Sequence, residues 1–147
     1  VWLLHDDSLL ARPTGARGPW VSPGTYSVTL EARGATFTQT VEVRGDPLLS
    51  VTQDMYEERE VYLLDLLAVE RRIDEARPDL LCGSSVDQSS RDASLCQIQR
   101  QTRQLMEALG GDEVRPGSLH PPTSEHVRRK AAIEDRLDRI LPPTRDN

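Results

Sequence analysis

The chain has 147 residues, of which 37% are hydrophobic, 29% charged and only 4% aromatic, as expected of one or two small folded domains. Its net charge of −6 argues against nucleic-acid binding, which needs a basic stripe that this sequence does not contain. The most apolar run, residues 61–69, is interrupted by Asp65 and is too short for a membrane span, which takes about 20 residues.

Residues 1–47 predict β-structure. Val1–Leu4 is a short apolar run, and apolar and polar residues alternate in Tyr26–Glu31 and again in Phe37–Val43. A short glycine turn separates the last two segments, so they should form an antiparallel hairpin. These three strands cannot close a sandwich, since an immunoglobulin-like domain takes about seven strands. We therefore expect the sheet to pack on the later helices or on partner strands before residue 1.

The tripeptide Arg44–Asp46 matches the one found in integrin ligands. It falls where the second strand runs into Pro47, which has no N–H to offer a neighbouring strand. A strand-ending Gly-Asp-Pro corner explains the tripeptide without a receptor. Residue 47 therefore ends the expected β module, and 48–147 form a helical tail.

The tail should contain three amphipathic helices, at about 52–77, 94–109 and 123–141. The expected N-terminal caps are Ser50 or Thr52 for the first helix, Ser94 for the second and Thr123 for the third. The residues expected to end these helices are, in the same order, Pro78, Gly110–Gly111 and Pro142–Pro143.

Apolar residues form one wide stripe on each expected helix. The stripes contain Met55, Tyr62, Leu63, Leu66, Leu67, Val69, Ile73 and Ala76, then Leu95, Ile98, Thr102, Leu105, Met106 and Leu109, and finally Val127, Ile133, Leu137, Ile140 and Leu141. Stripes of this width need partners, which predicts a helical hairpin or a three-helix bundle. The expected fold class is α+β: a partial antiparallel β-sandwich of about three strands, followed by this helical unit.

Cys82 and Cys96 are the two cysteines, and they bracket the connection between the first two helices. If those helices are antiparallel, the two side chains lie at the same end of the hairpin and could form a disulfide. Closing a loop of this length would add about 3 kcal/mol in the chain-entropy model. Two reduced, inert thiols remain the alternative, and the redox compartment decides between them.

The sequence gives no catalytic, cofactor-binding or metal-binding residue. A Gly-x-Ser-x-Gly elbow, a phosphate-cradling glycine loop and a dinucleotide fingerprint are all absent. The histidines His5, His120 and His126 lie in three separate segments, and neighbouring residues such as His5-Asp6-Asp7 do not share one face of an extended chain. We expect surface histidines and turn carboxylates rather than a metal site.

One longer pattern is more specific than composition. It comprises Val1-Trp2-x-Leu4, Gly18-Pro19, Pro23-Gly24-Thr25-Tyr26-x-Val28-x-Leu30, Gly34, Thr38-Gln39, Val41-x-Val43 and Asp46-Pro47. This pattern resembles the C-terminal region of bacterial secreted sortilin-like, BNR-repeat propeller proteins, which are often labelled glycosyl hydrolases or sialidase-like proteins. Leu48 departs from the arginine that often follows the Asp-Pro in that family.

The resemblance implies an immunoglobulin-like module and a helical tail that follow a large β-propeller in a secreted or periplasmic protein. The propeller, with its Asp-box repeats and any catalytic residues, would lie upstream, so no catalytic residue transfers to this chain. The expected role is that of a non-catalytic accessory segment that braces the propeller or binds other proteins.

Two other functions stay open at this point. The segment could contribute to the active site of a glycosyl hydrolase or sialidase-like parent enzyme. Alternatively, the near-heptad stripe from Met55 to Ala76 could make the helical part an oligomerisation module.

Overall fold

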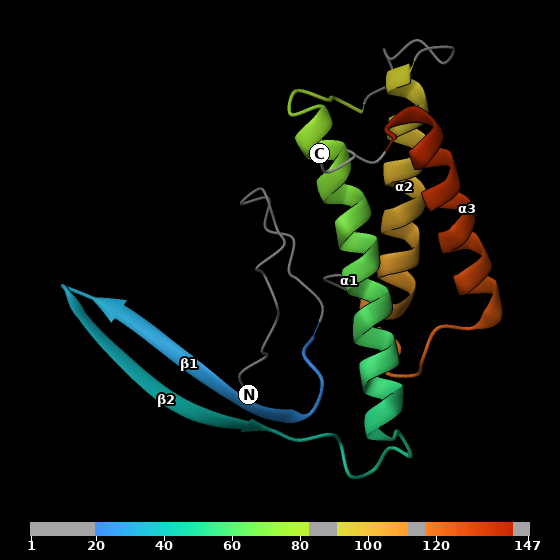
Figure 1. The fold of residues 1–147 in the computed structure, drawn as a ribbon. Helices are drawn as coiled ribbons and strands as arrows, with labels where there is room; N and C mark the ends of the chain where they lie inside the picture. The colour runs from blue at the N-terminus through green and yellow to red at the C-terminus, as the bar shows by residue number, and fades with distance from the viewer. Residues whose placement is uncertain (1–19, 83–90, 112–116, 143–147) are drawn as a thin grey trace.

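The computed structural model describes residues 20–82, 91–111 and 117–142 (Figure 1). These residues form an α+β fold with a two-stranded antiparallel sheet and three helices. In chain order, the elements are β1 (Gly24–Ala32), β2 (Ala35–Val43), α1 (Gln53–Ala76), α2 (Arg91–Gly110) and α3 (Ser124–Ile140). Figure 1 shows the two strands as a long ribbon that projects to one side of the helical bundle.

The ribbon, residues 24–43, is a hairpin with a two-residue turn. Its register runs without interruption from Gly24 opposite Val43 to Ala32 opposite Ala35. The turn residues Arg33 and Gly34 both have positive φ, at 51° and 78°. Left-handed conformations at both turn positions match the right-handed twist of the strands, and Gly34 adopts one without a steric penalty. The hairpin expected from the alternating pattern is therefore present, with each strand slightly longer than expected.

The expected third strand and the partial sandwich do not appear in the described part of the chain. Val1–Leu4, the candidate third strand, lies outside the described residues. Within those residues, the sheet has two strands, and no helix packs against the body of the ribbon. The expectation that the later helices cover the sheet is wrong, because the helices bury their apolar stripes against one another instead.

The three helices form an up-down-up bundle in which α2 packs against both α1 and α3. Paired residues such as Tyr62 with His126 and Arg72 with Asp138 show that α1 and α3 run parallel. The core contains Tyr62, Leu63, Leu66, Val69, Ile73, Leu80, Leu95, Cys96, Ile98, Leu105, Leu109, Ile133 and Leu137. The expected stripes supply most of it, although Val127 is 47% exposed rather than buried.

Local capping sets most of the helix ends. Thr52 caps α1 by accepting the Met55 N–H, so the cap is this residue and not Ser50. Gly111 follows α2 with a φ of 80°, the left-handed conformation typical of a residue just beyond a helix. The expected cap Ser94 lies inside α2, because this helix begins three residues earlier, at Arg91.

Candidate functional site: the exposed face of the β-ribbon

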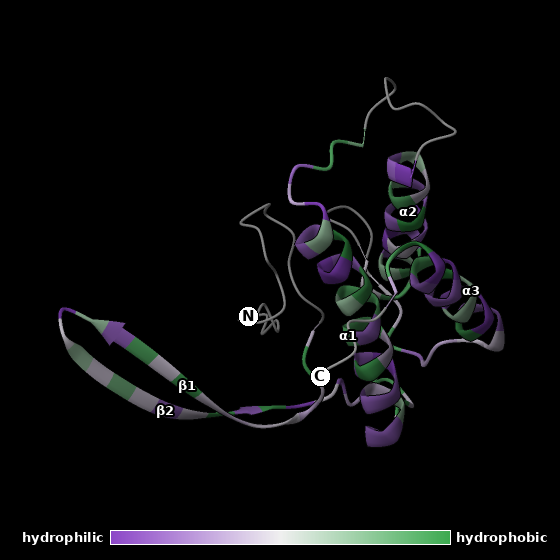
Figure 2. Cartoon of the chain, turned by 45° about the horizontal axis from the view of Figure 1, so that its top comes forward, coloured by the Kyte–Doolittle hydropathy of each residue, from purple (hydrophilic) through white to green (hydrophobic). Residues whose placement is uncertain are grey.

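One face of the ribbon is largely apolar, with Gln39 opposite Val28 as its polar member, and none of the described helices covers it. The register places Leu30 opposite Phe37 and Tyr26 opposite Val41, and Val28 lies between them on the same face. We call these five residues the apolar face. Leu30 and Phe37 are 61% and 62% exposed, and Val28 and Val41 about 40%. Figure 2 shows the resulting alternation of hydropathy along both strands.

The opposite face of the ribbon is polar throughout. It carries Thr25, Ser27, Thr29, Glu31, Thr36, Thr38, Thr40 and Glu42. Across it, the hydroxyl groups of Thr29 and Thr38 form a hydrogen bond of 3.2 Å. Hydroxyl and carboxylate groups are well solvated, so this face suits water, whereas the apolar face suits burial against another apolar surface.

The base of the ribbon is fixed to α1 by polar contacts. The Tyr26 hydroxyl donates to the carbonyl of Ser22 at 2.7 Å, and the Ser22 N–H donates to Glu60 Oε2 at 3.1 Å. The Gln53 side chain donates to the carbonyl of Pro23 at 2.9 Å. Burial raises the pKa of the Tyr26 phenol, and the nearby charge of Glu60 raises it further. These bonds give the ribbon a defined attachment point at the start of the bundle.

The Arg44–Asp46 tripeptide forms a corner held by its own neighbours. Arg44 pairs with Glu42 at 2.7 Å, and Asp46 Oδ1 accepts the Leu48 N–H at 2.9 Å. A Cβ on Gly45 would lie 3.2 Å from the Tyr56 side chain, so a larger residue here would require Tyr56 to shift by a few tenths of an ångström. These contacts agree with the strand-ending corner expected from the sequence.

Arg59 is a buried cation that links the end of α2 to the segment before α3. It is 3% exposed, and it donates to the carbonyls of Ser118 at 2.7 Å and Leu109 at 3.1 Å. Burial lowers the pKa of its guanidinium, which stays a cation at neutral pH. A cation at the last carbonyls of α2 also suits the helix dipole. Sequence reasoning missed Arg59, although its position between Met55 and Tyr62 keeps the spacing of the α1 stripe.

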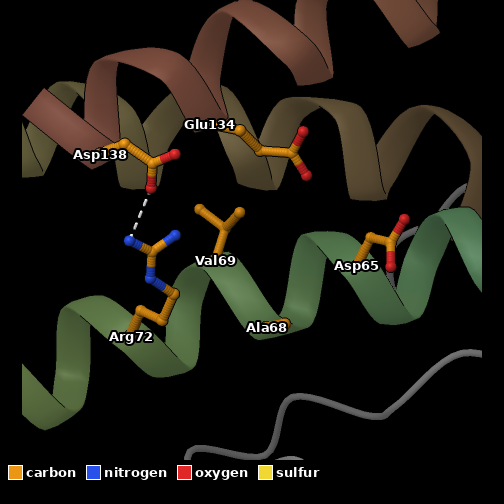
Figure 3. A pocket seen from close by; sticks show the side chains of 6 residues that line it. All are labelled: Asp65, Ala68, Val69, Arg72, Glu134 and Asp138. Atoms are coloured by element: carbon orange, nitrogen blue, oxygen red, sulfur yellow. Dashed lines mark hydrogen bonds and ion pairs between the residues drawn. The ribbon is translucent and has the colours of Figure 1, made fainter. Parts of the chain in front are cut away.

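A groove of about 260 Å³ lies between α1 and α3, and Figure 3 shows the side chains that line it. Of the lining residues, Arg72 pairs with Asp138 at 2.8 Å, and Asp65 and Glu134 both pair with Lys130. Burial lowers the pKa of Lys130, but its hydrogen bond to Asp65 and the charge of Glu134 outweigh that effect and raise it overall. The groove carboxylates are therefore neutralised by ion pairs, an arrangement that stabilises the bundle.

Cys82 and Cys96 form a disulfide in the structure, with their Cα atoms 5.3 Å apart. Of the two states that the sequence leaves open, the structure contains the bonded one. Arg77 and Asp92 form an ion pair between the end of α1 and the start of α2. The end of α1 and the start of α2 are thus joined both covalently and electrostatically.

Of the histidines within the described residues, His126 has a structural role at the start of a helix. His126 completes a capping box at the start of α3, since its Nδ1 accepts the Thr123 N–H while its own N–H donates to the Thr123 hydroxyl. His120 is exposed, and His5 lies outside the described residues. The described part of the chain holds no cluster of three or more His, Cys, Asp or Glu residues that could bind a metal ion.

Comparison with known proteins adds no relative: no protein-family model, curated protein or solved structure matches this chain. No helix in residues 20–82, 91–111 and 117–142 has the length and apolarity needed to cross a bilayer. Of the surfaces described above, the apolar face of the ribbon is the one whose composition calls for a partner.

Proposed function

We propose that this chain is a non-catalytic accessory segment that docks onto another folded unit through the apolar face of its β-ribbon. The observation that carries the proposal is the exposure of Leu30 and Phe37, at 61% and 62%, on an otherwise regular amphipathic hairpin. Fully burying a Leu or Phe side chain contributes about 1.5–3 kcal/mol, so docking would recover a large part of that for each residue.

The finer architecture that we propose is a partial β-sandwich. The ribbon would supply two of its strands, and further strands preceding it in the same polypeptide would cover the apolar face. The polar face, with Thr29 and Thr38 at its centre, would remain in water. The pattern in residues 1–47 that resembles sortilin-like, BNR-repeat propeller proteins supports an immunoglobulin-like module of this kind, with an upstream propeller as the partner.

Two features support a bracing or interaction role over a share in hydrolysis. Asp65, Glu134 and Asp138 in the α1–α3 groove are ion-paired, whereas a glycosidase needs one free acid and one free base or nucleophile across its cleft. The α1 stripe is not available as an oligomer interface, because its residues Tyr62, Leu66 and Ile73 are buried inside the bundle. The Cys82–Cys96 disulfide supports a secreted or periplasmic protein.

Hydroxyl-radical footprinting tests the docking. The full product of the gene is compared with residues 1–147 alone, and oxidation of Phe37 and Leu30 is measured by mass spectrometry. We expect oxidation of both residues to fall several-fold in the full product. Leu48 and Leu81, which are 90% and 82% exposed and lie outside the two strands, provide the reference for unchanged reactivity.

Equal oxidation of Phe37 in the two samples would overturn the docking proposal. The proposed parentage has a separate test in the gene itself. Repeated Ser-x-Asp-x-Gly boxes encoded upstream would support a propeller parent, and an upstream region without them would refute it while leaving the docking question to the footprint.

A further inference from the structure

The geometry of the hairpin determines which backbone groups point outward from it. A two-residue turn makes the flanking residues Ala32 and Ala35 a hydrogen-bonded pair. Bonded and non-bonded pairs then alternate along the antiparallel ladder. Residues on the side of the apolar face, such as Leu30 and Phe37, therefore use their N–H and C=O groups within the hairpin. Residues of the polar face direct theirs outward, so each strand has one edge of outward donors and acceptors.

The edge of β1 meets α1 where the strand begins. The C=O of Pro23, next to the first strand residue, accepts a hydrogen bond from the Gln53 side chain at 2.9 Å. The preceding residue, Ser22, donates its N–H to Glu60 of the same helix. An antiparallel strand as long as β1 would bring its flanking residues against Pro23 and Ser22, where these α1 side chains already lie. Full-length pairing along β1 is therefore obstructed.

The edge of β2 has no such obstruction among the described residues. There, β2 pairs with β1 alone, and the outward groups without a strand partner belong to Thr36, Thr38, Thr40 and Glu42. Natural sheet edges are usually blocked by proline, lysine, a bulge or a covering segment. The nine residues of β2 include neither proline nor lysine, and their register has no bulge. In agreement, Figure 1 shows β2 as the rim of the ribbon farther from the helices.

The β2 strand is complementary to a second copy of itself in one antiparallel register. Its nine residues, Ala35–Val43, are centred on Gln39, so two copies overlap completely only when Gln39 lies opposite Gln39 of the second copy. In that register, Phe37 of each copy lies opposite Val41 of the other, and an aromatic residue with a β-branched one is a favourable cross-strand pair. The charged Glu42 meets Thr36 rather than a like charge.

The same register gives a partner to the polar residue among the apolar ones. Gln39 would occupy a non-bonded pair, in which the two Cα atoms are about 4.5 Å apart. Its amide both donates and accepts, so the two copies of Gln39 can bond to each other. Shifts of two residues, the smallest that keep the outward groups paired, set Gln39 against Phe37 or Val41 and shorten the overlap. Complete overlap and a partner for Gln39 thus select one register.

We propose that two copies of this chain pair through their β2 edges, antiparallel and centred on Gln39, to form a four-stranded sheet with the strand order β1-β2-β2-β1. This inference is independent of the proposed docking, because strand addition uses main-chain groups at an edge and leaves the apolar face of each copy uncovered. One strand edge covers far less than the roughly 800 Å² per partner of a stable interface, so the expected dimer is weak and reversible.

Sedimentation equilibrium of residues 1–147 tests the association, together with two matched variants. We expect the weight-average mass to approach that of two chains at about 100 μM and above, as suits a small interface. Thr29 and Thr38 lie opposite each other with outward N–H groups, so replacing either by proline removes the same hydroxyl hydrogen bond and leaves the bonds within the hairpin in place. Thr38→Pro should weaken the dimer at least about tenfold, because each copy loses a donor at the β2 edge. Thr29→Pro should dimerise like the unsubstituted protein.

Cysteine substitution tests the register. Gln39→Cys and Val28→Cys place a thiol at either position of one opposed pair in the hairpin. In the proposed dimer, Gln39→Cys sets two thiols opposite each other at a Cα separation of about 4.5 Å, which a disulfide can span. The two native cysteines are already bonded to each other. After mild oxidation, we expect peptide mapping to find a link between residue 39 of two chains, and no link from Val28→Cys.

Each result has a defined meaning. A mass that rises with concentration, is reduced by Thr38→Pro and is accompanied by the link at residue 39 supports the proposal. A monomer at every concentration overturns it, as do equal effects of the two proline variants or a link through Val28→Cys in place of Gln39→Cys. None of these results decides the docking proposal, which depends on the footprint of Phe37 at concentrations below those of dimerisation.

Discussion

Leu30 and Phe37 lie directly opposite each other on the apolar face of the ribbon, and each is about three fifths exposed. They are the most exposed of the large apolar side chains of the ribbon, and they sit near its turn, away from the attachment to α1. The bundle, by contrast, buries Leu66, Ile73 and Leu137 completely. The chain thus has a self-sufficient helical core and an apolar strand pair that this core does not use.

This separation predicts how substitutions divide between stability and binding. Phe37→Thr in residues 1–147 should change the free energy of unfolding of the helices by no more than about 0.5 kcal/mol, because the ring packs on no helix. Leu66→Ala, at a fully buried site, should cost about 2–5 kcal/mol. Urea unfolding followed by circular dichroism at the helical band measures both. A loss above about 1 kcal/mol for Phe37→Thr would mean that the ribbon packs on the bundle.

Removal of the disulfide should destabilise the bundle without dismantling it. Cys82 and Cys96 are 14 residues apart, so their bond restricts the unfolded chain by about 3 kcal/mol in the chain-entropy model. We expect the double variant Cys82→Ser/Cys96→Ser to lose an amount of that order in urea unfolding. Leu81→Ser, next to Cys82 and largely exposed, is the control and should remain close to the parent. Equal urea midpoints for the unsubstituted protein, the double variant and the control would show that the disulfide does not stabilise the fold.

Arg59 should be required for the closure of the bundle. Arg59→Met keeps most of the side chain's length but leaves the carbonyls of Leu109 and Ser118 without their donors, which should cost about 1–3 kcal/mol. Arg100→Met makes the same chemical change at an exposed position of α2 and should cost less than about 0.5 kcal/mol. The two variants are compared by thermal and urea unfolding. The role assigned to Arg59 is wrong if they behave alike.

Alkaline pH should weaken the fold through Tyr62. Burial raises the pKa of its phenol to about 12 in the folded protein, from an ordinary value of 10. Because the unfolded chain loses this proton first, the stability that the neutral phenol provides is complete below pH 10 and is lost between about pH 10 and 12. Urea midpoints across this range should fall, and absorbance at 295 nm should show tyrosine ionisation that extends to about pH 12.

Tyr62→Phe is the matching control, since it removes the titrating group together with the hydroxyl bond to the His126 carbonyl. Its urea midpoint should start lower at neutral pH and should fall less steeply with rising pH. If all tyrosines of the unsubstituted protein titrate near pH 10, that result would contradict the burial that the structure assigns to Tyr62.

Local signals in the sequence were sufficient for most of the secondary structure. Thr123 caps its helix as expected, and Thr52, one of the two candidates for the first helix, caps that one, because a hydroxyl that accepts a nearby N–H acts over a few residues. The alternation in the two strands likewise predicted which residues share a face. The helix boundary at Ser94 was missed, since the favourable cap spacing there competes with a helix that begins upstream at Arg91.

The placement of the strands relative to the helices could not be predicted from such signals. Nothing in the pattern around Phe37 indicates whether the helices cover it, because amphipathic strands look the same with or without a partner in the same chain. The burial of Arg59 could not be predicted for a similar reason. A charged residue in an apolar stripe can be buried only when carbonyl groups from distant segments accept its hydrogen bonds, and here those carbonyls belong to Leu109 and Ser118. Val127 shows the reverse, an apolar stripe position that no neighbour covers.

The attachment of the ribbon has a mechanical consequence. The polar contacts at its base meet α1 at Gln53 and Glu60, in the first third of that helix, whereas the covalent bond between Cys82 and Cys96 closes the opposite end of the bundle. A pulling force that enters through the strands therefore reaches a helix terminus that no covalent cross-link secures. Under tension, the first turns of α1 would peel away while the cross-linked end keeps its shape.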